Sequence, residues 1–440
     1  MSYSAQPSLS DFYQTLSLQE RHSYAFVEMN IKYFSYYNAR FGHDYGDELL
    51  HLIQHILETF LKNRGIVQHV YGDTFHFFIV CSEDPSRSDD ENVLQGFLSE
   101  LVDYLFDNHD RHAHQNIFMS FGILLPHSVY GSYDDLLMKV RFARKNCPQL
   151  KHRTYSYEIF SDDNYFNYLA QQDLAKQLTN ARKNNEFEIF VQPKVDPRTE
   201  KIVAGEVLMR WNHSNGIPLN KYISVLQKYT EIYLVDFALF QKACAYLKEG
   251  LTRNEPRVPL SFNVSEVAVC DQNFCSDYFS VISEFGIPPE YLEFEFLEDI
   301  KLQQDANVRN VLKQFQEKGM TCSLDDFGAG NSSFAFLLQG GIDCIKLDRI
   351  FFQGELTESR KQVLYHLLKI ADATNVKVVA EGVEDRTYID FLKQTNCFAV
   401  QGFYYYPPMP LSEFQTLLNY QSKHAPELIP GTLLPHSDTP

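Results

Sequence analysis

Residues 321–330 read TCSLDDFGAG, a short apolar run that ends in two adjacent aspartates, Asp325 and Asp326. Other polar residues stand in the same position, at or just after a short apolar run: Glu206 in GEVLMRW, Asn263 in SFNVSE, Glu295 and Glu298 in EFEFLED, Lys346 in CIKLD, and Glu381 in VVAEGVED. In a parallel α/β barrel, the carboxyl ends of the strands meet at one mouth. The sequence therefore predicts that these side chains converge on one site.

A repeated alternation of strand-like and helix-like segments supports a barrel. Helix-length segments such as 306–319 and 359–375 separate most of the candidate strands. Eight strands in about 235 residues fit an eight-stranded α/β barrel. The candidate strands are residues 187–195, 201–209, 258–265, 292–298, 321–327, 344–348, 376–383 and 399–406.

The N-terminal part of the chain has the pattern of a smaller α/β domain. Residues 24–31 predict a strand, 47–63 an amphipathic helix, and 66–82 two strands around a tight Gly-Asp turn. The fold class is therefore α/β, with an N-terminal α/β domain followed by the barrel. The expected divisions are an N-terminal extension (1–21), the first domain (22–160), a linker (161–185), the barrel (186–420) and a mobile tail (421–440).

Composition and charge limit the kinds of partner. Hydrophobic residues make up 44% and charged residues 22% of the 440 residues, which is typical of a globular protein. The net charge of −18 argues against polymeric nucleic acid as a partner, because proteins normally bind its phosphates with a basic surface. No stretch approaches the roughly 20 apolar residues that span a bilayer. Residues 1–12 have neither the basic start nor the apolar core of a signal peptide. We therefore expect a soluble, cytoplasmic protein without a transmembrane segment.

Taken singly, the polar residues at the strand ends have ordinary explanations. Glu206 could form a surface ion pair, Asn263 could cap a loop, and Lys346 could be solvated. Glu295 is different because it lies inside an apolar alternation, where an unpaired buried carboxylate is costly. It needs a cation or a proton as a partner.

Taken together, these residues favour two divalent cations. Carboxylates that meet at one mouth repel one another unless cations lie between them. Asp325 and Asp326 would point to opposite faces within a strand, but at its end both can turn toward one site. Mg²⁺ and Mn²⁺ are favoured because hard cations bind carboxylate and amide oxygens.

Two such cations roughly 3.5–4 Å apart can bridge a water, lower its pKa and hold a phosphodiester for in-line attack. Lys346 could stabilise charge on the phosphoryl group or orient the water. The Asp326-Phe327-Gly328 triplet also occurs in protein kinases, but the sequence contains no kinase Gly-rich loop, VAIK-type lysine or HRD loop. The pattern therefore favours phosphodiester hydrolysis.

Residues 186–418 resemble the EAL-domain cyclic-di-GMP phosphodiesterases over the whole domain. The matching segments, in order, are VQPKVD, GEVLMRW, FNVSE, EFLE, DDFGAG, IKLD, AEGVE and QGFYYYPP. The resemblance implies a (β/α)8-type barrel that hydrolyses cyclic di-GMP to linear pGpG with two divalent cations, Mg²⁺ or Mn²⁺. It also implies a homodimer formed through the EAL domain. The signature triplet is Glu-Val-Leu, with Val207 in place of the usual Ala.

The resemblance also implies roles for individual residues. One cation would be held by Glu206, Asn263, Glu295 and Asp325, and the other by Asp325, Asp326 and Glu381. Lys346 would contact the attacking water, and Glu298 would steady the loop at 328–333 that leads to the dimer contact. Gln192, Arg210 and Gln401 match the substrate contacts of the family.

Some positions depart from the family pattern. Leu297 replaces the usual Thr of the Glu-x-Thr-Glu motif, Pro407 stands where an Arg is usual, and Gln227 stands where a Glu is usual. These departures concern substrate affinity and rate more than the metals. They leave open a catalytically silent cyclic-di-GMP receptor and, ranked last, a scaffold in which both nucleotide sites are vestigial.

Residues 22–160 resemble a GGDEF domain, the diguanylate cyclase fold, through NARFGHDYGDELL and YGDTF. Thr74 stands where the family has a metal-binding Glu, and Asn30 where it has a metal-binding Asp. The resemblance therefore predicts a degenerate domain without cyclase activity. Asn38 and Asp47 fit the guanine-contacting positions, so GTP binding and a regulatory role stay open beside a structural or dimerising one.

Overall fold

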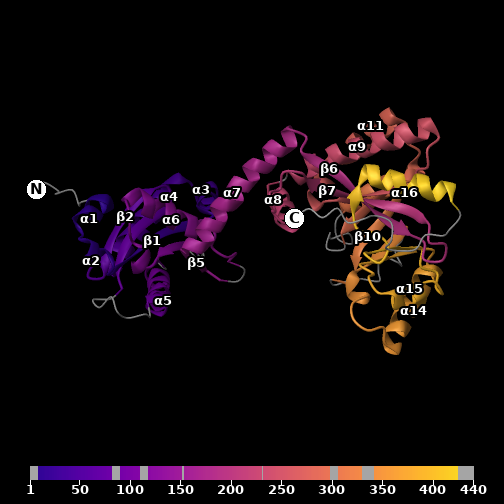
Figure 1. The fold of residues 1–440 in the computed structure, drawn as a ribbon. Coiled ribbons are helices and arrows are strands. Elements are labelled where there is room, and N and C mark those ends of the chain that lie inside the picture. The colour runs from indigo at the N-terminus through magenta and orange to yellow at the C-terminus, as the bar shows by residue number, and fades with distance from the viewer. Residues whose placement is uncertain are drawn as a thin grey trace, which may run out of the picture. The chain divides into compact units, whose positions relative to one another are not determined.

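The computed structural model describes residues 8–81, 90–109, 117–150, 153–229, 231–297, 306–329 and 341–424. The chain divides into two compact units between Gln171 and Gln172, and each is described by itself (Figure 1). Glu298 and most of the loop at 328–333 lie outside the described residues.

The first unit contains a five-stranded sheet with the strand order β2-β3-β1-β4-β5. β1 is antiparallel to β3 and β4, and β4 is parallel to β5. β2 and β3 form the predicted hairpin around Gly72, which has a positive φ of 51°. The strands are β1 (Tyr24–Lys32), β2 (Gly65–Tyr71), β3 (Thr74–Val80), β4 (Phe118–Leu124) and β5 (Tyr155–Ile159).

Helices cover both faces of this sheet. α4 (His43–Leu61) and α5 (Asp90–His109) pack on one face, while α1 (Leu9–Thr15) and α6 (Tyr133–Lys145) pack on the other. The remaining elements are α2 (Leu18–Arg21), α3 (Phe34–Phe41) and the 3₁₀ turn η1 (Pro126–Ser128). The described part of the extension expected at 1–21 thus forms helices, and Leu9 and Tyr13 of α1 are buried in the core.

The second unit is a closed barrel, which confirms the predicted fold class. Its strands follow the order β13-β12-β11-β10-β9-β8-β7-β6-β14, and a pairing of β13 with β6 closes the sheet. The strands are β6 (Phe187–Val195), β7 (Ile202–Trp211), β8 (Leu260–Val264), β9 (Leu292–Leu297), β10 (Thr321–Phe327), β11 (Cys344–Leu347), β12 (Lys377–Glu381), β13 (Ala399–Gln401) and β14 (Met409–Pro410).

The barrel is not fully parallel, in contrast to the arrangement inferred from the sequence. β6 runs antiparallel to β7, whereas β7 to β13 run parallel to one another. The link between β6 and β7 is a short turn in which Asp196 N–H donates to Lys201 O at 2.9 Å. A parallel connection needs a crossover of a dozen or more residues, so this turn can only join antiparallel strands.

Helices surround the barrel in Figure 1. Several end or begin at well-formed caps: α9 ends at Asn254 (φ 53°), α11 ends at Gly286 (φ 63°), and Thr357 caps α14 through the N–H of Arg360. The helices and 3₁₀ turns are α7 (Asp162–Lys183), α8 (Leu219–Lys228), α9 (Ile232–Arg253), α10 (Glu266–Cys270), α11 (Phe274–Phe285), η2 (Pro289–Tyr291), α12 (Ala306–Glu317), η3 (Arg349–Phe351), α14 (Glu358–Ala373), α15 (Arg386–Leu392) and α16 (Leu411–Lys423).

Two expected segments correspond to parts of these elements. The segment expected as a linker is largely α7, whose Leu174, Leu178 and Ala181 are buried against the second unit. Of the tail expected at 421–440, residues 421–423 belong to α16, and those beyond 424 lie outside the described residues. Within the described ranges, no helix combines the length and the apolar character needed to cross a membrane.

Candidate active site

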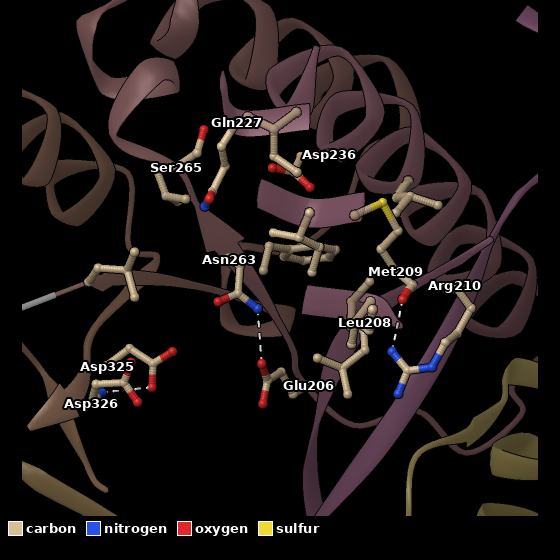
Figure 2. A pocket seen from close by; sticks show the side chains of 18 of the residues that line it. Glu206, Leu208, Met209, Arg210, Gln227, Asp236, Asn263, Ser265, Asp325 and Asp326 are labelled. Atoms are coloured by element: carbon tan, nitrogen blue, oxygen red, sulfur yellow. Dashed lines mark hydrogen bonds between the residues drawn. The ribbon is translucent and has the colours of Figure 1, made fainter. Parts of the chain in front are cut away.

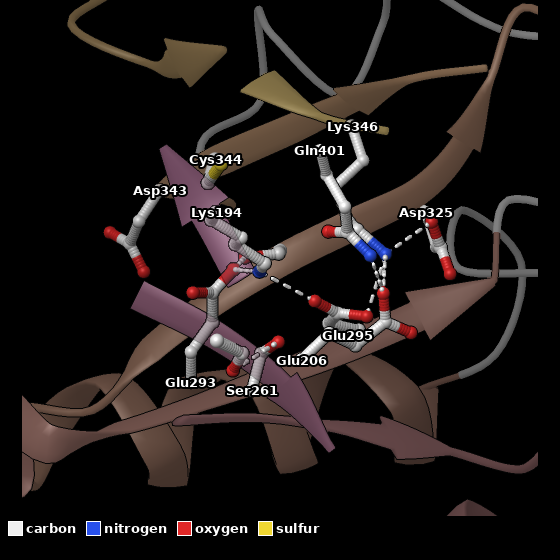
Figure 3. Close-up of polar contacts among 12 residues, drawn as sticks. Lys194, Glu206, Ser261, Glu293, Glu295, Asp325, Asp343, Cys344, Lys346 and Gln401 are labelled. Carbon is white, nitrogen blue, oxygen red and sulfur yellow. Dashed lines mark hydrogen bonds and ion pairs between the residues drawn. The ribbon is translucent and has the colours of Figure 1, made fainter. Parts of the chain in front are cut away.

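Lys346 lies at the centre of the acidic residues at the barrel mouth. Its Nζ is 2.7 Å from Glu295 Oε2, 2.7 Å from Glu381 Oε1, 2.9 Å from Asp325 Oδ1 and 3.5 Å from Glu206 Oε2. The Lys346 side chain is buried, with only 1% of its surface exposed. Four carboxylates from four strands therefore converge on one ammonium group, as the strand-end pattern predicts. Figure 3 shows three of them, Glu206, Glu295 and Asp325, near Lys346.

Asp325 and Asp326 reach the same site because the backbone of β10 is irregular at its end. The register between β10 and β11 shifts between Leu324 and Phe327, and Asp326 has a left-handed φ of 54°. In a regular strand, adjacent side chains would point to opposite faces. Here carboxylate oxygens of Asp325, Asp326 and Glu381 all lie within 4.8 Å of one another.

Amide side chains hold Glu206 from two directions. Asn263 Nδ2 donates to Glu206 Oε1 at 2.9 Å, and Gln401 Nε2 donates to Glu206 Oε2 (Figures 2 and 3). Gln401 Nε2 also donates to Gln192 Oε1 at 3.1 Å, and Gln192 Nε2 donates to the backbone carbonyl of Tyr406 at 3.2 Å. Gln192 lies within β6, directly opposite Glu206 of β7, rather than at the end of a parallel strand.

The carboxylates differ in their affinity for protons. Burial raises the pKa of Glu206, and the neighbouring charge of Glu295 raises it further. Burial also raises the pKa of Glu381 to about 8, although the charge of Lys346 opposes this. For Glu295, burial would raise the pKa, but Lys194 and Lys346 outweigh burial and lower it to about 2. Glu295 therefore stays ionised while its neighbours compete for protons.

The residues present fit a pair of hard divalent cations. The donors at the mouth are carboxylate and amide oxygens, which Mg²⁺ and Mn²⁺ prefer. The barrel mouth and the layer beneath it hold six carboxyl groups, of which Asp326 is exposed, and two lysines, so the acidic groups outnumber the cations and divalent ions would offset part of this excess. These groups are Glu206, Glu293, Glu295, Asp325, Asp326, Glu381, Lys194 and Lys346.

A cavity of about 340 Å³ extends from the acidic residues toward α8 and α9 (Figure 2). Arg210, Gln227, Asp236 and Leu297 are among the residues that line it. The Arg210 guanidinium donates to the backbone carbonyl of Met209 at 2.8 Å and lies 5.5 Å from the centre of the Phe190 ring. The cavity is within the size range of small-molecule sites, which combine apolar walls with a few polar groups.

Asp236 is a residue of this cavity that the sequence analysis did not single out. It lies on α9, and burial raises its pKa to about 8. The cavity also contains Tyr278, whose pKa is raised by burial and by the nearby charge of Asp236. The sequence signal that could have identified Asp236 is its position as a single carboxylate within the apolar run IYLVDFALF. Burial of a carboxylate is costly, and buried titratable groups are concentrated at functional sites.

In the first unit, Asn30 and Thr74, the two residues that the resemblance predicts to stand in place of metal ligands, lie side by side. Asn30 of β1 is paired with Thr74 of β3, and Asn30 Nδ2 donates to Thr74 Oγ1 at 3.3 Å. Asn30 Nδ2 also lies 3.4 Å from Asp73 O, which can accept from it. Asn38 Oδ1 is buried and accepts no hydrogen bond from the described residues, while Asp47 on α4 is exposed. At the paired position of β1 and β3, the neutral side chains of Asn30 and Thr74 are thus hydrogen-bonded to each other.

Family comparisons match both units. The EAL domain model matches residues 175–408, and the model described as diguanylate cyclase, GGDEF domain, matches residues 5–154. The cyclic di-GMP phosphodiesterase NbdA of Pseudomonas aeruginosa is 24% identical over 413 residues, covering 92% of this chain and 51% of the relative. The cyclic di-GMP phosphodiesterase RocR of Pseudomonas aeruginosa is 30% identical over 234 residues, covering 52% of this chain and 59% of the relative.

A solved structure described as PaMucR phosphodiesterase in complex with c-di-GMP is similar to the second unit. Its TM-score is 0.52 at 24% identity, and the match covers 55% of this chain and 99% of that chain. At this level of identity the likeness supports the fold alone. The chain spans about half the length of the curated relatives it matches.

Proposed function

The chain belongs to the EAL domain family, and on that premise we propose that it hydrolyses cyclic di-GMP to linear pGpG in the presence of Mg²⁺ or Mn²⁺. The observation that carries this proposal is the convergence of Glu206, Glu295, Asp325 and Glu381 on Lys346 at the mouth of the barrel. The 340 Å³ cavity beside them supports it, since it offers room for part of a nucleotide next to the acidic residues. NbdA and RocR, both phosphodiesterases of cyclic di-GMP by name, are relatives over this region.

In this proposal the acidic residues hold the cations in two groups. Glu206, Asn263, Glu295 and Asp325 would hold one, and Asp325, Asp326 and Glu381 would hold the other. When bound, the two cations lower the pKa of the attacking water and neutralise charge on the phosphodiester. The left-handed backbone of Asp326 supports this division, because it lets both aspartates face one site.

Lys346 is the proposed partner of the water. Its ammonium group lies among the carboxylates, where it can orient the water and stabilise negative charge on the phosphoryl oxygens. The water oxygen bonds to phosphorus and the bond from phosphorus to the 3′-oxygen breaks. The proton that the water gives up ends on the leaving 3′-oxygen, which becomes a hydroxyl group, and the ring opens to a linear dinucleotide with a 5′-phosphate. Glu298, which lies outside the described residues, keeps its proposed role of steadying the loop that follows β10.

Substrate contacts are proposed on both sides of this centre. Gln192 and Gln401 are hydrogen-bonded to each other beside Glu206, and Arg210 presents a cation to the cavity. We add Asp236 to this set, because its neutral carboxyl group can accept a hydrogen bond from guanine N1–H through its carbonyl oxygen and donate one to guanine O6. This pairing would orient one base of the ligand.

A second candidate function is a receptor that binds cyclic di-GMP without cleaving it. Leu297 lines the cavity beside Asp325 and Asp326, where it offers no hydroxyl group to the polar residues. Pro407 also removes a cation that the family usually has at the mouth. Neither change removes a proposed metal ligand, so we rank hydrolysis first.

The first domain is proposed to be inactive as a cyclase. The Asn30 amide donates a hydrogen bond to the Thr74 hydroxyl at the position where the family has two carboxylates, and neutral groups bind Mg²⁺ poorly without added charge. The same proposal includes weak binding of GTP through Asn38 and Asp47 and a regulatory effect of this domain on the barrel. It also includes a homodimer formed through the EAL domain.

The deciding experiment is incubation of the purified chain with cyclic di-GMP in Mg²⁺ and in Mn²⁺, with pGpG followed by chromatography. Glu206→Ala is run alongside, and Glu413→Ala serves as the matched control, since Glu413 is an exposed glutamate of α16 outside the proposed site. We expect product from the wild type and the control, and none from Glu206→Ala. Binding without product in the wild type would favour the receptor, and equal turnover by Glu206→Ala would refute the assigned site.

A further inference from the structure

Lys194 is a buried lysine that belongs to none of the groups proposed above to touch substrate or cations. Its side chain is fully buried. Its Nζ lies 2.8 Å from Glu295 Oε1 and 3.3 Å from Glu293 Oε1, and both contacts are hydrogen bonds (Figure 3). Burial would lower the pKa of Lys194, but Glu293 and Glu295 outweigh burial and raise it. Lys194 is therefore a permanent cation inside the barrel.

Lys194 lies one layer deeper in the barrel than the residues at the mouth. Gln192 of β6 is paired with Glu206 of β7, whereas Lys194 is paired with Ala204, two residues before Glu206. Side chains two residues apart on a strand point to the same face. Lys194 thus lies beneath Gln192, in the same way that Glu293 lies beneath Glu295 on β9.

Glu295 is held between two lysines that take different oxygens. Lys194 binds Oε1 from below, and Lys346 binds Oε2 from the mouth at 2.7 Å. The carboxylate plane is therefore fixed, and Oε2 is the oxygen that faces the other acidic residues. A free glutamate side chain in the same place could rotate and present either oxygen or both.

Glu293 completes this lower layer but does not reach the mouth. It accepts hydrogen bonds from Lys194 and from the Ser323 hydroxyl. Glu293 thus balances part of the Lys194 charge and can be changed without touching a proposed metal ligand. A change at Glu293 therefore tests the effect of charge beneath the mouth, and a change at Lys194 tests the orientation of Glu295.

We propose that Lys194 is a positioning residue that holds Glu295 Oε1, so that Glu295 presents only Oε2 to a divalent cation. This inference rests on the proposed function, and it adds a residue beneath the first layer of ligands. Residues that orient metal ligands in this way typically affect metal affinity or activity 10- to 100-fold. Lys194 contacts neither the cavity nor the substrate side of the mouth, so its effect passes through Glu295.

The test uses three variants, Lys194→Met, Glu293→Gln and the double variant. Lys194→Met alone leaves two buried carboxylates with one cation fewer, which can destabilise the fold. The double variant removes one positive and one negative charge, so the net charge of the cluster stays the same while Glu295 Oε1 loses its donor. Glu293→Gln keeps the bond between Lys194 and Glu295 and serves as the matched control.

Two readouts are measured on the full chain: Mn²⁺ affinity without substrate, by calorimetry, and kcat and KM for cyclic di-GMP. We expect the double variant to fold, to bind Mn²⁺ about 10- to 100-fold more weakly, and to lose kcat by a similar factor at an unchanged KM. Glu293→Gln is expected to stay close to wild type in both readouts.

The outcomes separate this inference from the function on which it rests. Wild-type Mn²⁺ affinity and kcat in the folded double variant would overturn the role of Lys194 alone. Failure of both Lys194 variants to fold would assign the residue to stability and overturn positioning. Absence of Mn²⁺ binding by the wild type would overturn the two-cation proposal itself, and the inference with it.

Discussion

Lys346 Nζ and Glu381 Oε1 lie 2.7 Å apart, across the neighbouring strands β11 and β12. Lys346 is also paired with Asp325, with Glu295 and, at 3.5 Å, with Glu206, so one ammonium group is shared among acidic residues from four other strands. Burial raises the pKa of Glu381 to about 8 even with this lysine beside it. The lysine and the carboxylates therefore form one electrostatic unit, and changes to any member should affect the others.

The first prediction concerns the charge of Lys346. Lys346→Met should lower kcat by about 10²–10³-fold, the usual effect of removing one donor that stabilises charge in a transition state. Mn²⁺ binding should persist, because the carboxylates stay in place. Turnover and calorimetry on the same preparation check this, with Lys377→Met, an exposed lysine of β12, as the control. Unchanged kcat in Lys346→Met would exclude Lys346 from the reaction.

The second prediction concerns removal of the cations. Chelation should abolish hydrolysis and lower the melting temperature, because the excess of negative charge in the barrel is then uncompensated. Readdition of Mg²⁺ or Mn²⁺ at 100 times its Kd should restore stability by about 2.7 kcal/mol per site. Differential scanning calorimetry with and without the cation measures this. A melting temperature that does not respond to either cation would contradict the assigned site.

The third prediction is that Asp236→Asn stabilises the protein as pH rises. The pKa of Asp236 is about 8 in the folded chain against an ordinary value of 3.8, so the folded state binds the proton more tightly. The stability that the neutral carboxyl contributes is complete below pH 3.8 and is lost as pH rises toward 8. Asn cannot ionise, so the variant should gain at least about 1 kcal/mol at pH 8, roughly 2–4 °C in a domain of this size.

Thermal melts of the wild type and Asp236→Asn at several pH values between 4 and 9 check this. The difference in melting temperature should grow across the window and level off above pH 8. A difference that stays constant with pH would show that Asp236 does not titrate there.

The fourth prediction concerns the first domain. In a Glu206→Ala background, where hydrolysis cannot hide synthesis, the chain should form no cyclic di-GMP from GTP with Mg²⁺ or Mn²⁺. Asn30→Asp combined with Thr74→Glu should gain cation-dependent thermal stabilisation by GTP, because two carboxylates then replace a neutral pair. Asn30→Asp alone is the control. Detection of cyclic di-GMP made by the Glu206→Ala chain would contradict the assignment of an inactive domain.

Much of the fold could be predicted from the sequence because its signals are local. The alternation of apolar runs and helix-length segments indicates an α/β barrel, and a polar residue at the end of such a run is placed at the mouth by the topology itself. Glu206, Asn263, Glu295, Asp325, Lys346 and Glu381 lie together in the structure for this reason. Their roles as ligands remain predictions.

Other features depend on contacts between distant residues, and only the tertiary structure decides them. The antiparallel direction of β6 brings Gln192 opposite Glu206 and carries Lys194 beneath Glu295, a residue 101 positions away. The left-handed φ of Asp326 turns adjacent aspartates toward one site.

The pKa of Asp236 also could not be predicted from the sequence. Its sequence neighbours identify a carboxylate on an apolar helix, but burial in a cavity formed by several elements raises its pKa. The sequence by itself determined the architecture and which residues stand at the mouth, because strand periodicity and chain direction are local properties. The tertiary structure decided orientation, pairing and charge state, because these depend on burial and on electrostatic fields that the whole barrel creates.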